Sequence, residues 1–389
     1  MIPELHFRTK VVISSHAPWS EFYVTPHYVA MLLGRRARVL FIEPPIRWHP
    51  GSPGFSARRC LQVLAPNVRQ VAPNIWALRP GCLPLGRIRC VKKLNAILIA
   101  RQVLRALRLH DAIDPLLWLC DTENALVLRG ALPTAPCVFH AIDYQVSEKD
   151  ANAAVQLALT SDVVIASSRE ILASLPVDRQ PSYVLPNAWL PWEEPAPAGP
   201  PPELQDLPKP YAGLIGTIGG TLDFDLLKDL AKSFQGSLVL IGEPSRGLPP
   251  SDARSLGALF KMPNVHHLGR KPTVALRQYI AAFLVCLAPY KQNMRVYSSS
   301  PLKVYQYLSF GKPVVSTPVA QLEDLEPLIY VARDRASFVR TVCEIVTRPE
   351  NPEIIRKRQQ FAAANTWEAR WATLVDIFQT EPTLKVLAA

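Results

Sequence analysis

A lysine in the first turn of a short predicted helix is the residue of this chain whose position most directly suggests chemistry. Ser300 is a suitable N-cap, Pro301 a suitable first helical residue, and Gly311 can adopt the left-handed conformation that ends a helix. The N-terminus of a helix carries free N–H groups and a partial positive charge, so the cation of Lys303 is unfavourable there unless an anion binds nearby. We therefore expect a phosphate at this helix end. An ordinary strand–helix–strand unit with a solvated lysine fits the same local pattern.

The run from Ser300 to Pro318 resembles the donor-binding signature of GT-B glycosyltransferases, which use nucleotide sugars. In that family the helix N-terminus and the lysine hold the donor diphosphate, and a residue one turn later, usually glutamate, holds the ribose. This chain has Gln306 there, and Ser298 stands where many retaining members carry a second glutamate. The Lys-x-x-Gln spacing is similar to that of xanthan-type glucuronosyltransferases, which are inverting and act at the bacterial inner membrane. A neutral Gln306 adds no negative charge, so we expect the site to accept an acidic donor sugar such as glucuronic acid.

Further donor contacts are expected where the strands of the second half end, because open parallel α/β sheets bind ligands at the carboxyl ends of their strands. A glycine-rich loop, residues 216–221, follows one such strand, and the resemblance implies that it lies beneath the donor. Taken singly, the shorter loops also fit simple turns. The predicted donor-binding residues are Gly216, Thr217, Gly219, Glu243, Arg270, Tyr290, Ser300, Leu302, Lys303 and Gln306.

The acid–base group should come from the first half of the chain. An inverting transfer needs a carboxylate or histidine that removes the proton of the acceptor hydroxyl. Asp143 follows a predicted strand and best matches the family's aspartate, so it is the predicted base; Asp121 and Glu123 are the reserve candidates. Asp143 could instead cap the helix that begins near Ser147.

The loop after the first strand is the predicted acceptor-binding segment. It carries His16, which could form a hydrogen bond to an acceptor sugar, and Trp19, which could stack on one.

Strand-like and helix-like segments alternate along the whole chain, which predicts parallel sheets with helices on both faces. The expected strands are 11–15, 39–42, 116–120, 137–141, 163–166, 183–185, 211–215, 238–241, 265–268, 284–289, 314–316 and 328–331, and a helix near 26–33 should end at Gly34. Residues 186–210 hold nine prolines, a density that predicts a linker without regular structure.

The predicted fold class is therefore α/β, and the resemblance specifies GT-B: two doubly wound, Rossmann-like domains that face a central cleft. Residues 1–190 would form the acceptor-binding domain, which the C-terminal crossing helix 366–389 joins. Residues 191–210 would be the Pro-rich linker, and residues 211–365 the nucleotide-sugar donor-binding domain.

The net charge of +11 is concentrated in the first half: Arg35 to Arg108 holds fifteen Lys and Arg against the single acid Glu43. Segment 87–108 has helical spacing, with an apolar face through Leu94, Ile97 and Leu104, and basic residues on the other face. Such a helix favours an anionic membrane surface. A helix packed on the sheet with a solvated basic face is the alternative. No helix-turn-helix, zinc or RNP-type pattern accompanies the charge, so nucleic acid is not an expected partner.

Seven dispersed cysteines without CxxC spacing predict reduced thiols. No histidine cluster suggests a metal, and the resemblance likewise implies no metal cofactor. The start of the chain, Met1 to Lys10, lacks the apolar stretch of a signal peptide, and no uncharged run reaches transmembrane length. We expect a cytoplasmic protein that associates peripherally with the inner membrane.

Together these features predict an enzyme: a metal-independent, UDP-sugar-dependent glycosyltransferase of bacterial exopolysaccharide synthesis, with a polyprenyl-diphosphate-linked oligosaccharide as acceptor. Two alternatives stay open. One is a nucleotide-sugar epimerase or hydrolase of the same fold. The other is a non-catalytic GT-B-like subunit, which the departures at Ser298 and Gln306 favour.

Overall fold

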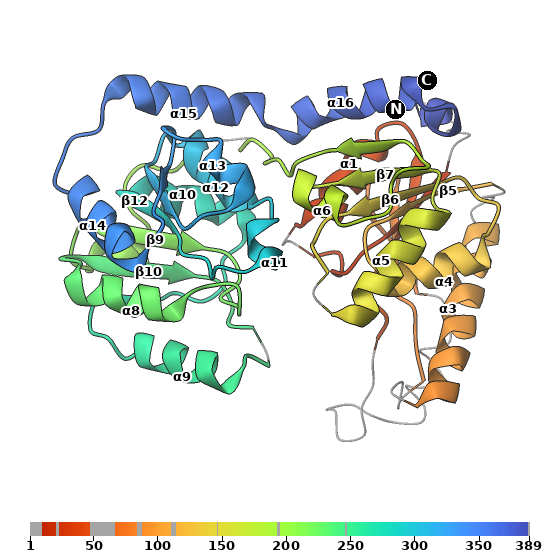
Figure 1. The fold of residues 1–389 in the computed structure, drawn as a ribbon, viewed down its shortest axis with the longest axis horizontal. Helices are drawn as coiled ribbons and strands as arrows, with labels where there is room; N and C mark the ends of the chain where they lie inside the picture. Colours follow the sequence, from red (N-terminus) through yellow and green to blue (C-terminus); the bar gives the residue numbers. More distant parts are fainter. Residues whose placement is uncertain are drawn as a thin grey trace. The chain divides into compact units, whose positions relative to one another are not determined.

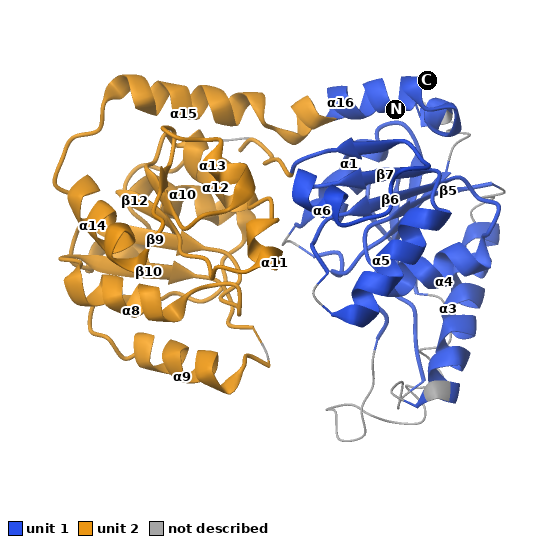
Figure 2. Cartoon of the chain, in the orientation of Figure 1, with its two compact units in different colours: residues 1–186, 371–389 blue, residues 187–370 orange. Residues whose placement is uncertain are grey.

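The structure is a computed structural model, and it describes residues 10–20, 23–46, 67–83, 88–109, 114–145, 147–192, 195–245 and 247–387. The chain forms two compact units, residues 1–186 with 371–389 and residues 187–370 (Figure 2). Each unit is built around one sheet whose strands are almost all parallel. The predicted α/β class with two doubly wound sheets is thus confirmed.

The sheet of the first unit has the strand order β3-β4-β2-β1-β5-β6-β7-β8 in the described residues. All neighbours are parallel except β3 and β4. The order reverses between β1 and β5, which makes the carboxyl ends of these two strands the topological switch point. The strands are β1 (Lys10–Ser14), β2 (Arg38–Ile42), β3 (Val68–Ala72), β4 (Ile75–Leu78), β5 (Leu116–Leu119), β6 (Cys137–Ala141), β7 (Val163–Ala166) and β8 (Ser182–Val184).

Helices cover this sheet, and its central strands are buried, as a parallel sheet requires. Ser147 caps α5 by accepting a hydrogen bond from the N–H of Asp150 at 3.1 Å, so the alternative role of Asp143 as that cap is wrong. The helices of this unit are α1 (Thr25–Leu33), α3 (Arg89–Leu109), α4 (Glu123–Ala131), α5 (Glu148–Thr160) and α6 (Arg169–Ala173).

Two side-chain amides fasten α3 to the chain that precedes it. Gln102 bonds both to the N–H and to the carbonyl of Gly81, each at 3.0 Å, and Asn95 does the same to Leu83 at 2.7 and 3.1 Å. Because these buried amides lie on the inner face, the apolar face predicted for segment 87–108 is wrong in its first half. Leu94 and Ile97 are 45% and 50% exposed, on the solvent side with the basic residues.

The pair β3 and β4 was not among the predicted strands. It is an antiparallel hairpin joined at Asn74, which has a positive φ of 60°. β3 mixes charged, polar and apolar residues and is not buried, whereas β4 is an apolar run of only four residues that pairs with β2.

The C-terminal segment from Trp371 belongs to the first unit. Within it, the Phe378 ring meets the Trp118 ring edge-on with centroids 6.2 Å apart. Glu381 accepts a hydrogen bond from the hydroxyl of Tyr183. This segment contains most of α16 (Trp367–Thr380) and a terminal 3-10 turn, Pro382–Leu387.

The sheet of the second unit has the order β11-β10-β9-β12-β13-β14, and all its described strands are parallel. Helix α8 is drawn on the opposite side of this sheet from α12 and α13 (Figure 1). The strands are β9 (Tyr211–Ile215), β10 (Ser237–Ile241), β11 (Val265–His267), β12 (Val285–Ala288), β13 (Val314–Ser316) and β14 (Tyr330–Val331). The helices are α7 (Pro202–Gln205), α8 (Phe224–Ser233), α9 (Pro250–Leu259), α10 (Leu276–Ala282), α11 (Met294–Tyr297), α12 (Leu302–Ser309), α13 (Ala320–Glu323), α14 (Arg335–Ile345) and α15 (Pro352–Ala364).

The Pro-rich segment is part of this second unit, and its lack of regular structure was predicted wrongly. Helix α7 lies inside it with Pro202 as its first residue, a position that tolerates proline because the N–H there is unpaired anyway. The hydroxyl of Tyr279 in α10 donates to Glu203 at 2.8 Å, which holds α7 to the body of the unit.

The buried Arg358 of α15 secures the end of α12. Its Nη1 donates to the carbonyl of Gly311 at 3.1 Å and to Glu350, and its Nε donates to Leu328 at 2.7 Å. Gly311 has a φ of 66°, so the predicted left-handed stop of this helix is confirmed.

No helix in the described part of the chain combines the length and the apolar character needed to cross a bilayer. The six cysteines that the structure describes form no disulfide bond.

Candidate functional site

Three glycines line up at the carboxyl edge of the second sheet. Gly216, Gly242 and Gly269 follow β9, β10 and β11 with φ of 115°, 155° and 67°. The Gly242 N–H donates to the Gly269 carbonyl at 2.9 Å, and a Cβ on Gly242 would lie 1.8 Å from the Gly216 carbonyl oxygen. A side chain is therefore excluded at Gly242, and the positive φ disfavours one at all three positions, so the backbone itself forms this edge beside the switch point between β9 and β12.

Lys303 reaches this glycine edge from the first turn of α12. A Cβ on Gly216 would lie 3.2 Å from the Lys303 Nζ. The same nitrogen lies 5.4 Å from the centroid of the Tyr290 ring, at the end of β12. Burial lowers the pKa of Lys303 to about 8, and no described carboxylate lies within ion-pair distance of it. A partly desolvated cation without a carboxylate partner is suited to an anionic ligand.

The start of α12 differs from the sequence prediction. The helix begins at Leu302, Pro301 takes the N-cap position, and no side chain caps it, so the assignment of Ser300 as N-cap is wrong. The reason is a long-range partner: Asn187 donates its N–H to the Ser300 hydroxyl at 3.1 Å and its amide to the Ser300 carbonyl at 2.8 Å. The first N–H groups of α12 therefore keep no side-chain acceptor within the described chain, and they remain suited to a phosphate.

Gln306 lies one turn after Lys303 and is only 5% exposed. Its side-chain amide forms no hydrogen bond with any described residue. The next residue, Tyr307, is fully buried and accepts a hydrogen bond from the N–H of Ile215 at 2.9 Å. This bond ties α12 to the end of β9. Sequence reasoning missed it because an apolar-patterned tyrosine in a helix is indistinguishable from an ordinary core residue.

The remaining predicted donor residues form a ring of loops on the same edge. Glu243 and Arg270 are exposed, as is Thr217. Gly219 is buried, and a Cβ there would lie 2.8 Å from the Ser245 hydroxyl. The Ile218 N–H donates to the Glu243 carbonyl at 3.1 Å, and the Ser245 N–H donates to the Ile218 carbonyl at 3.0 Å, which holds the glycine loop to the loop after β10.

The predicted base, Asp143, lies two residues beyond the carboxyl end of β6 in the first unit. Its side chain is exposed, and its backbone carbonyl accepts a hydrogen bond from the Gln145 amide at 3.0 Å. An exposed carboxylate at this edge is open to an acceptor from solvent. The reserve candidate Glu123 is the exposed first residue of α4, where an acid favours the helix dipole.

Asp121 occupies the switch point of the first sheet, after β5. Burial raises its pKa, while hydrogen bonds from Ser14 and from the N–H groups of Asn124 and Ala125, and the charge of His16, oppose that rise. Its Oδ1 accepts from the Asn124 N–H at 2.7 Å, whereas its buried Oδ2 has no partner among the described residues. A buried carboxyl group with a raised pKa at the switch point of the sheet keeps Asp121 a chemical candidate.

The acceptor loop places its two predicted residues differently. His16 is exposed. The Trp19 ring is half-buried and packs edge-on against Phe41 at 5.0 Å, and its backbone N–H donates to Glu43 at 2.7 Å. Glu43 is fully buried and paired with Arg69 at 2.6 Å, so it holds the loop in place. Sequence reasoning missed this role because Arg69 lies in the unpredicted strand β3.

Comparisons with known proteins bear on the second unit first. Residues 224–348 match the family model described as Glycosyl transferases group 1. A Bacillus subtilis protein that carries the name of a teichuronic acid biosynthesis glycosyltransferase, TuaH, is 27% identical over 160 residues, which cover 40% of this chain and 39% of the relative. The chain thus aligns with well under half of that relative's length.

Solved structures match over nearly the whole chain. A sucrose-phosphate synthase from Thermosynechococcus elongatus has a TM-score of 0.70 at 15% identity and covers 96% of this chain and 99% of its own. Anabaena HepE in complex with UDP and glucose has a TM-score of 0.68 at 14% identity, and the match covers 96% of this chain and 100% of HepE. A trehalose-6-phosphate protein from E. coli bound with UDP-2-fluoro glucose has a TM-score of 0.69 at 12% identity, and the match covers 95% of this chain and 98% of the E. coli chain. At these identities the likeness establishes the fold.

These matches confirm the predicted fold: the chain has the GT-B fold, and its residues 224–348 are similar to the group 1 glycosyltransferases.

Proposed function

We propose that this protein is a metal-independent glycosyltransferase that transfers a sugar from a UDP-sugar. The observation that carries the proposal is Lys303, a partly desolvated cation without a carboxylate partner in the described chain, beside the glycine edge and the uncapped start of α12. The group 1 family match supports it, and so do two similar structures that contain UDP or a UDP-sugar analogue.

The proposed catalysis follows from the charge that develops when the bond between the sugar and the diphosphate of the donor breaks. As the bond between the sugar and the diphosphate lengthens, negative charge grows on the leaving phosphate oxygens. Lys303 and the first N–H groups of α12 would stabilise that charge, and they would supply the positive field that a metal ion supplies in other transferases. This division of labour is why we propose that no metal cofactor is needed.

Calorimetric titration with UDP tests this site. In Lys303→Ala, we expect UDP to bind at least about tenfold more weakly, since a charge-assisted hydrogen bond contributes about 1.5–3 kcal/mol. Lys261→Ala removes an exposed lysine after α9 and is the matched control. Equal UDP affinity in wild type and Lys303→Ala would refute the donor site.

We further propose glucuronic acid as the donor sugar and an inverting mechanism. Gln306 offers hydrogen bonds without negative charge, so a uronate carboxylate would meet no repulsion from it. UDP-glucuronic acid should therefore bind more tightly than UDP-glucose. Gln306→Glu should weaken the binding of UDP-glucuronic acid about tenfold or more, and it should change the affinity for UDP-glucose by less than about threefold. A wild type that turns over only neutral donors would exclude the uronate.

Asp143 is the proposed base that accepts the proton of the attacking hydroxyl. Its exposure makes it accessible, whereas the raised pKa and switch-point position of Asp121 make that residue the alternative. Loss of the base should lower kcat by about 10²–10⁴. Asp143→Asn and Asp121→Asn should be compared at equal UDP affinity. A large loss of kcat only in Asp121→Asn would transfer the role to Asp121.

The proposed acceptor is a polyprenyl-diphosphate-linked oligosaccharide of polysaccharide synthesis, which His16 and Trp19 would help to bind. Such an acceptor lies in a membrane, and the membrane-binding surface that we propose is on α3. Its N-terminal half, which follows β4 at the carboxyl side of the sheet, exposes Leu94 and Ile97 beside the exposed Lys92 and Lys93. We propose that this surface docks peripherally on the cytoplasmic face of the inner membrane, as each basic residue near anionic lipid contributes about 1 kcal/mol.

Flotation with vesicles that contain phosphatidylglycerol tests the membrane surface. The double variant Leu94→Gln/Ile97→Gln should lose most of its vesicle binding. Leu159→Gln is the matched control, because Leu159 in α5 is 57% exposed but has no basic cluster around it in α5. Equal flotation of the double variant and the control would contradict docking through α3.

A further inference from the structure

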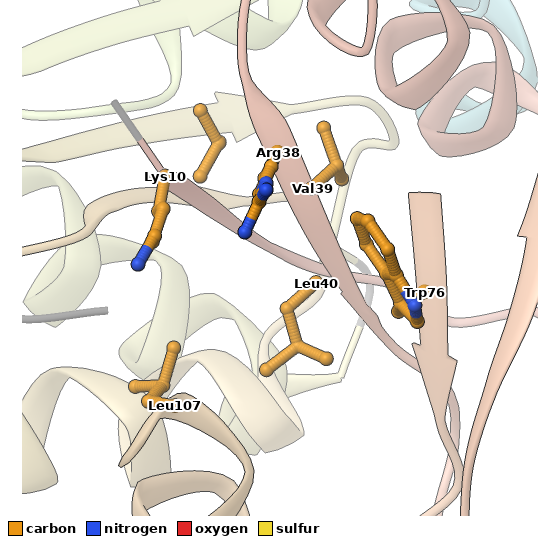
Figure 3. Close-up of a pocket in the computed structure, with 7 residues that line it drawn as sticks. Lys10, Arg38, Val39, Leu40, Trp76 and Leu107 are labelled. Atoms are coloured by element: carbon orange, nitrogen blue, oxygen red, sulfur yellow. The ribbon is translucent and has the colours of Figure 1, made fainter. Parts of the chain in front are cut away.

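A hollow opens at the amino edge of the first sheet, the edge opposite to Asp121 and Asp143. It has a volume of about 330 Å³, counting the part that is open to solvent. It lies where β1 and β2 begin and where α3 ends. Its lining residues are Lys10, Val11, Arg38, Val39, Leu40, Trp76 and Leu107 (Figure 3).

Two cations stand side by side at this hollow because of the strand register. Lys10 and Arg38 are the first residues of β1 and β2 and are direct partners in the parallel ladder. Neighbouring residues of a ladder project from the same face of the sheet, and Figure 3 shows both charged side chains extending from adjacent strands. An ammonium and a guanidinium at this spacing can bind one anionic group together, and the guanidinium can contact two of its oxygens at once.

The rest of the lining is apolar. Leu40 and Leu107 are 7% and 4% exposed, so they form a floor, and Trp76 is the ladder partner of Leu40 on the next strand. The leucines offer no hydrogen-bond donor to an anion, whereas the two cations need a polar or charged partner. The hollow therefore combines an anion-binding rim with an apolar floor, a combination that suits one molecule with both characters.

We propose that this hollow binds an amphipathic anion, a molecule whose phosphate or carboxylate head contacts Lys10 and Arg38 and whose apolar chain lies on Leu40, Trp76 and Leu107. The site lies within the first unit and uses none of the residues assigned to sugar transfer. It is thus independent of the proposed function, and either could fail without the other.

Decyl phosphate, kept below its micelle concentration, is the probe for a calorimetric titration of the full chain. We expect it to bind at least about tenfold more tightly than inorganic phosphate, since the chain adds buried apolar surface. It should also bind at least about tenfold more tightly than decanol, which lacks the charge. Equal affinities for decyl phosphate and inorganic phosphate, or for decyl phosphate and decanol, would overturn the proposal.

Two charge-matched double variants locate the binding. Lys10→Gln/Arg38→Gln should weaken the binding of decyl phosphate at least about tenfold, because charge-assisted hydrogen bonds are lost. Lys149→Gln/Arg179→Gln removes the same charge from exposed positions of the same unit and should leave its affinity unchanged. Equal loss in both pairs would mean attraction to the net charge of the protein and would overturn the site. Both pairs should unfold at the same urea concentration as the wild type, which shows that each variant is folded.

The natural source of the anion can then be separated. If Lys10→Gln/Arg38→Gln also lowers flotation with phosphatidylglycerol vesicles, the head belongs to a bilayer lipid. If flotation is unchanged while decyl phosphate binding is lost, the ligand is a soluble amphiphile.

Discussion

The ammonium group of Lys303 lies directly over the backbone of Gly216: a Cβ at that glycine would stand 3.2 Å from Nζ. The two residues are far apart in the sequence, and the hydrogen bond from the Ile215 N–H to Tyr307 brings them together. This contact joins the glycine loop to the lysine helix, the two features from which a diphosphate site was predicted.

Gly216→Ala tests that relationship. Gly216 has a φ of 115°, and the new methyl group would also press on Lys303, so we expect UDP to bind about tenfold more weakly. Gly199→Ala is the matched control: its φ of 77° imposes similar backbone strain, but nothing lies within 4 Å of its Cβ. Calorimetry should show normal UDP affinity for the control. A normal affinity for both variants would contradict the close contact.

UDP binding should weaken as the pH rises above about 8. The pKa of Lys303 in the free protein is lowered to about 8 by burial, so the cation is present below this pH and is lost above it. Each further pH unit should then reduce affinity by up to about tenfold. Lys303→Arg keeps its charge at all these pH values and should give a flat profile between pH 7 and 9. Parallel profiles for the two proteins would exclude Lys303 as the titrating group.

His140 should make the first unit sensitive to acid. It is fully buried in β6, and burial lowers its pKa to about 4, so it is neutral in the folded protein. Between pH 6.5 and 4 the unfolded chain binds a proton that the folded chain does not. Stability is therefore lost as the pH falls through this window and is unaffected above it. The loss by pH 4 should be about 3 kcal/mol.

Urea unfolding at pH 7 and pH 4 measures this effect. In His140→Gln, which can still accept the hydrogen bond that Trp118 donates to the ring, the loss of unfolding free energy between these pH values should be about 3 kcal/mol smaller than in wild type. Identical pH dependence in the two proteins would show that other groups govern acid unfolding.

Arg358→Met should destabilise the second unit by about 3–5 kcal/mol, because it removes one partner of a buried ion pair. It also leaves the Gly311 and Leu328 carbonyls without their donor. The neighbouring Lys357→Met removes an exposed pair with Glu353 and should cost under about 1 kcal/mol. Differential scanning calorimetry compares the two. Equal small effects would mean that Arg358 does not secure the end of α12.

The sequence by itself determined the order of the elements and where most strands end. Short apolar, β-branched runs such as those in β2 and β13 are local signals, and so is Gly311, whose left-handed φ ends α12. Because ligands bind where parallel strands end, these same signals pointed to the glycine edge and to Lys303.

Only the tertiary structure decided which partners complete those elements. Ser300 does not cap α12 because Asn187, more than a hundred residues earlier, takes both its hydroxyl and its carbonyl. Leu94 and Ile97 face solvent because Asn95 and Gln102 direct their own face of α3 to the backbone at 81–83. Propensity and periodicity act within a few residues, whereas a side chain's hydrogen-bond partner and its burial depend on segments that only the fold brings together.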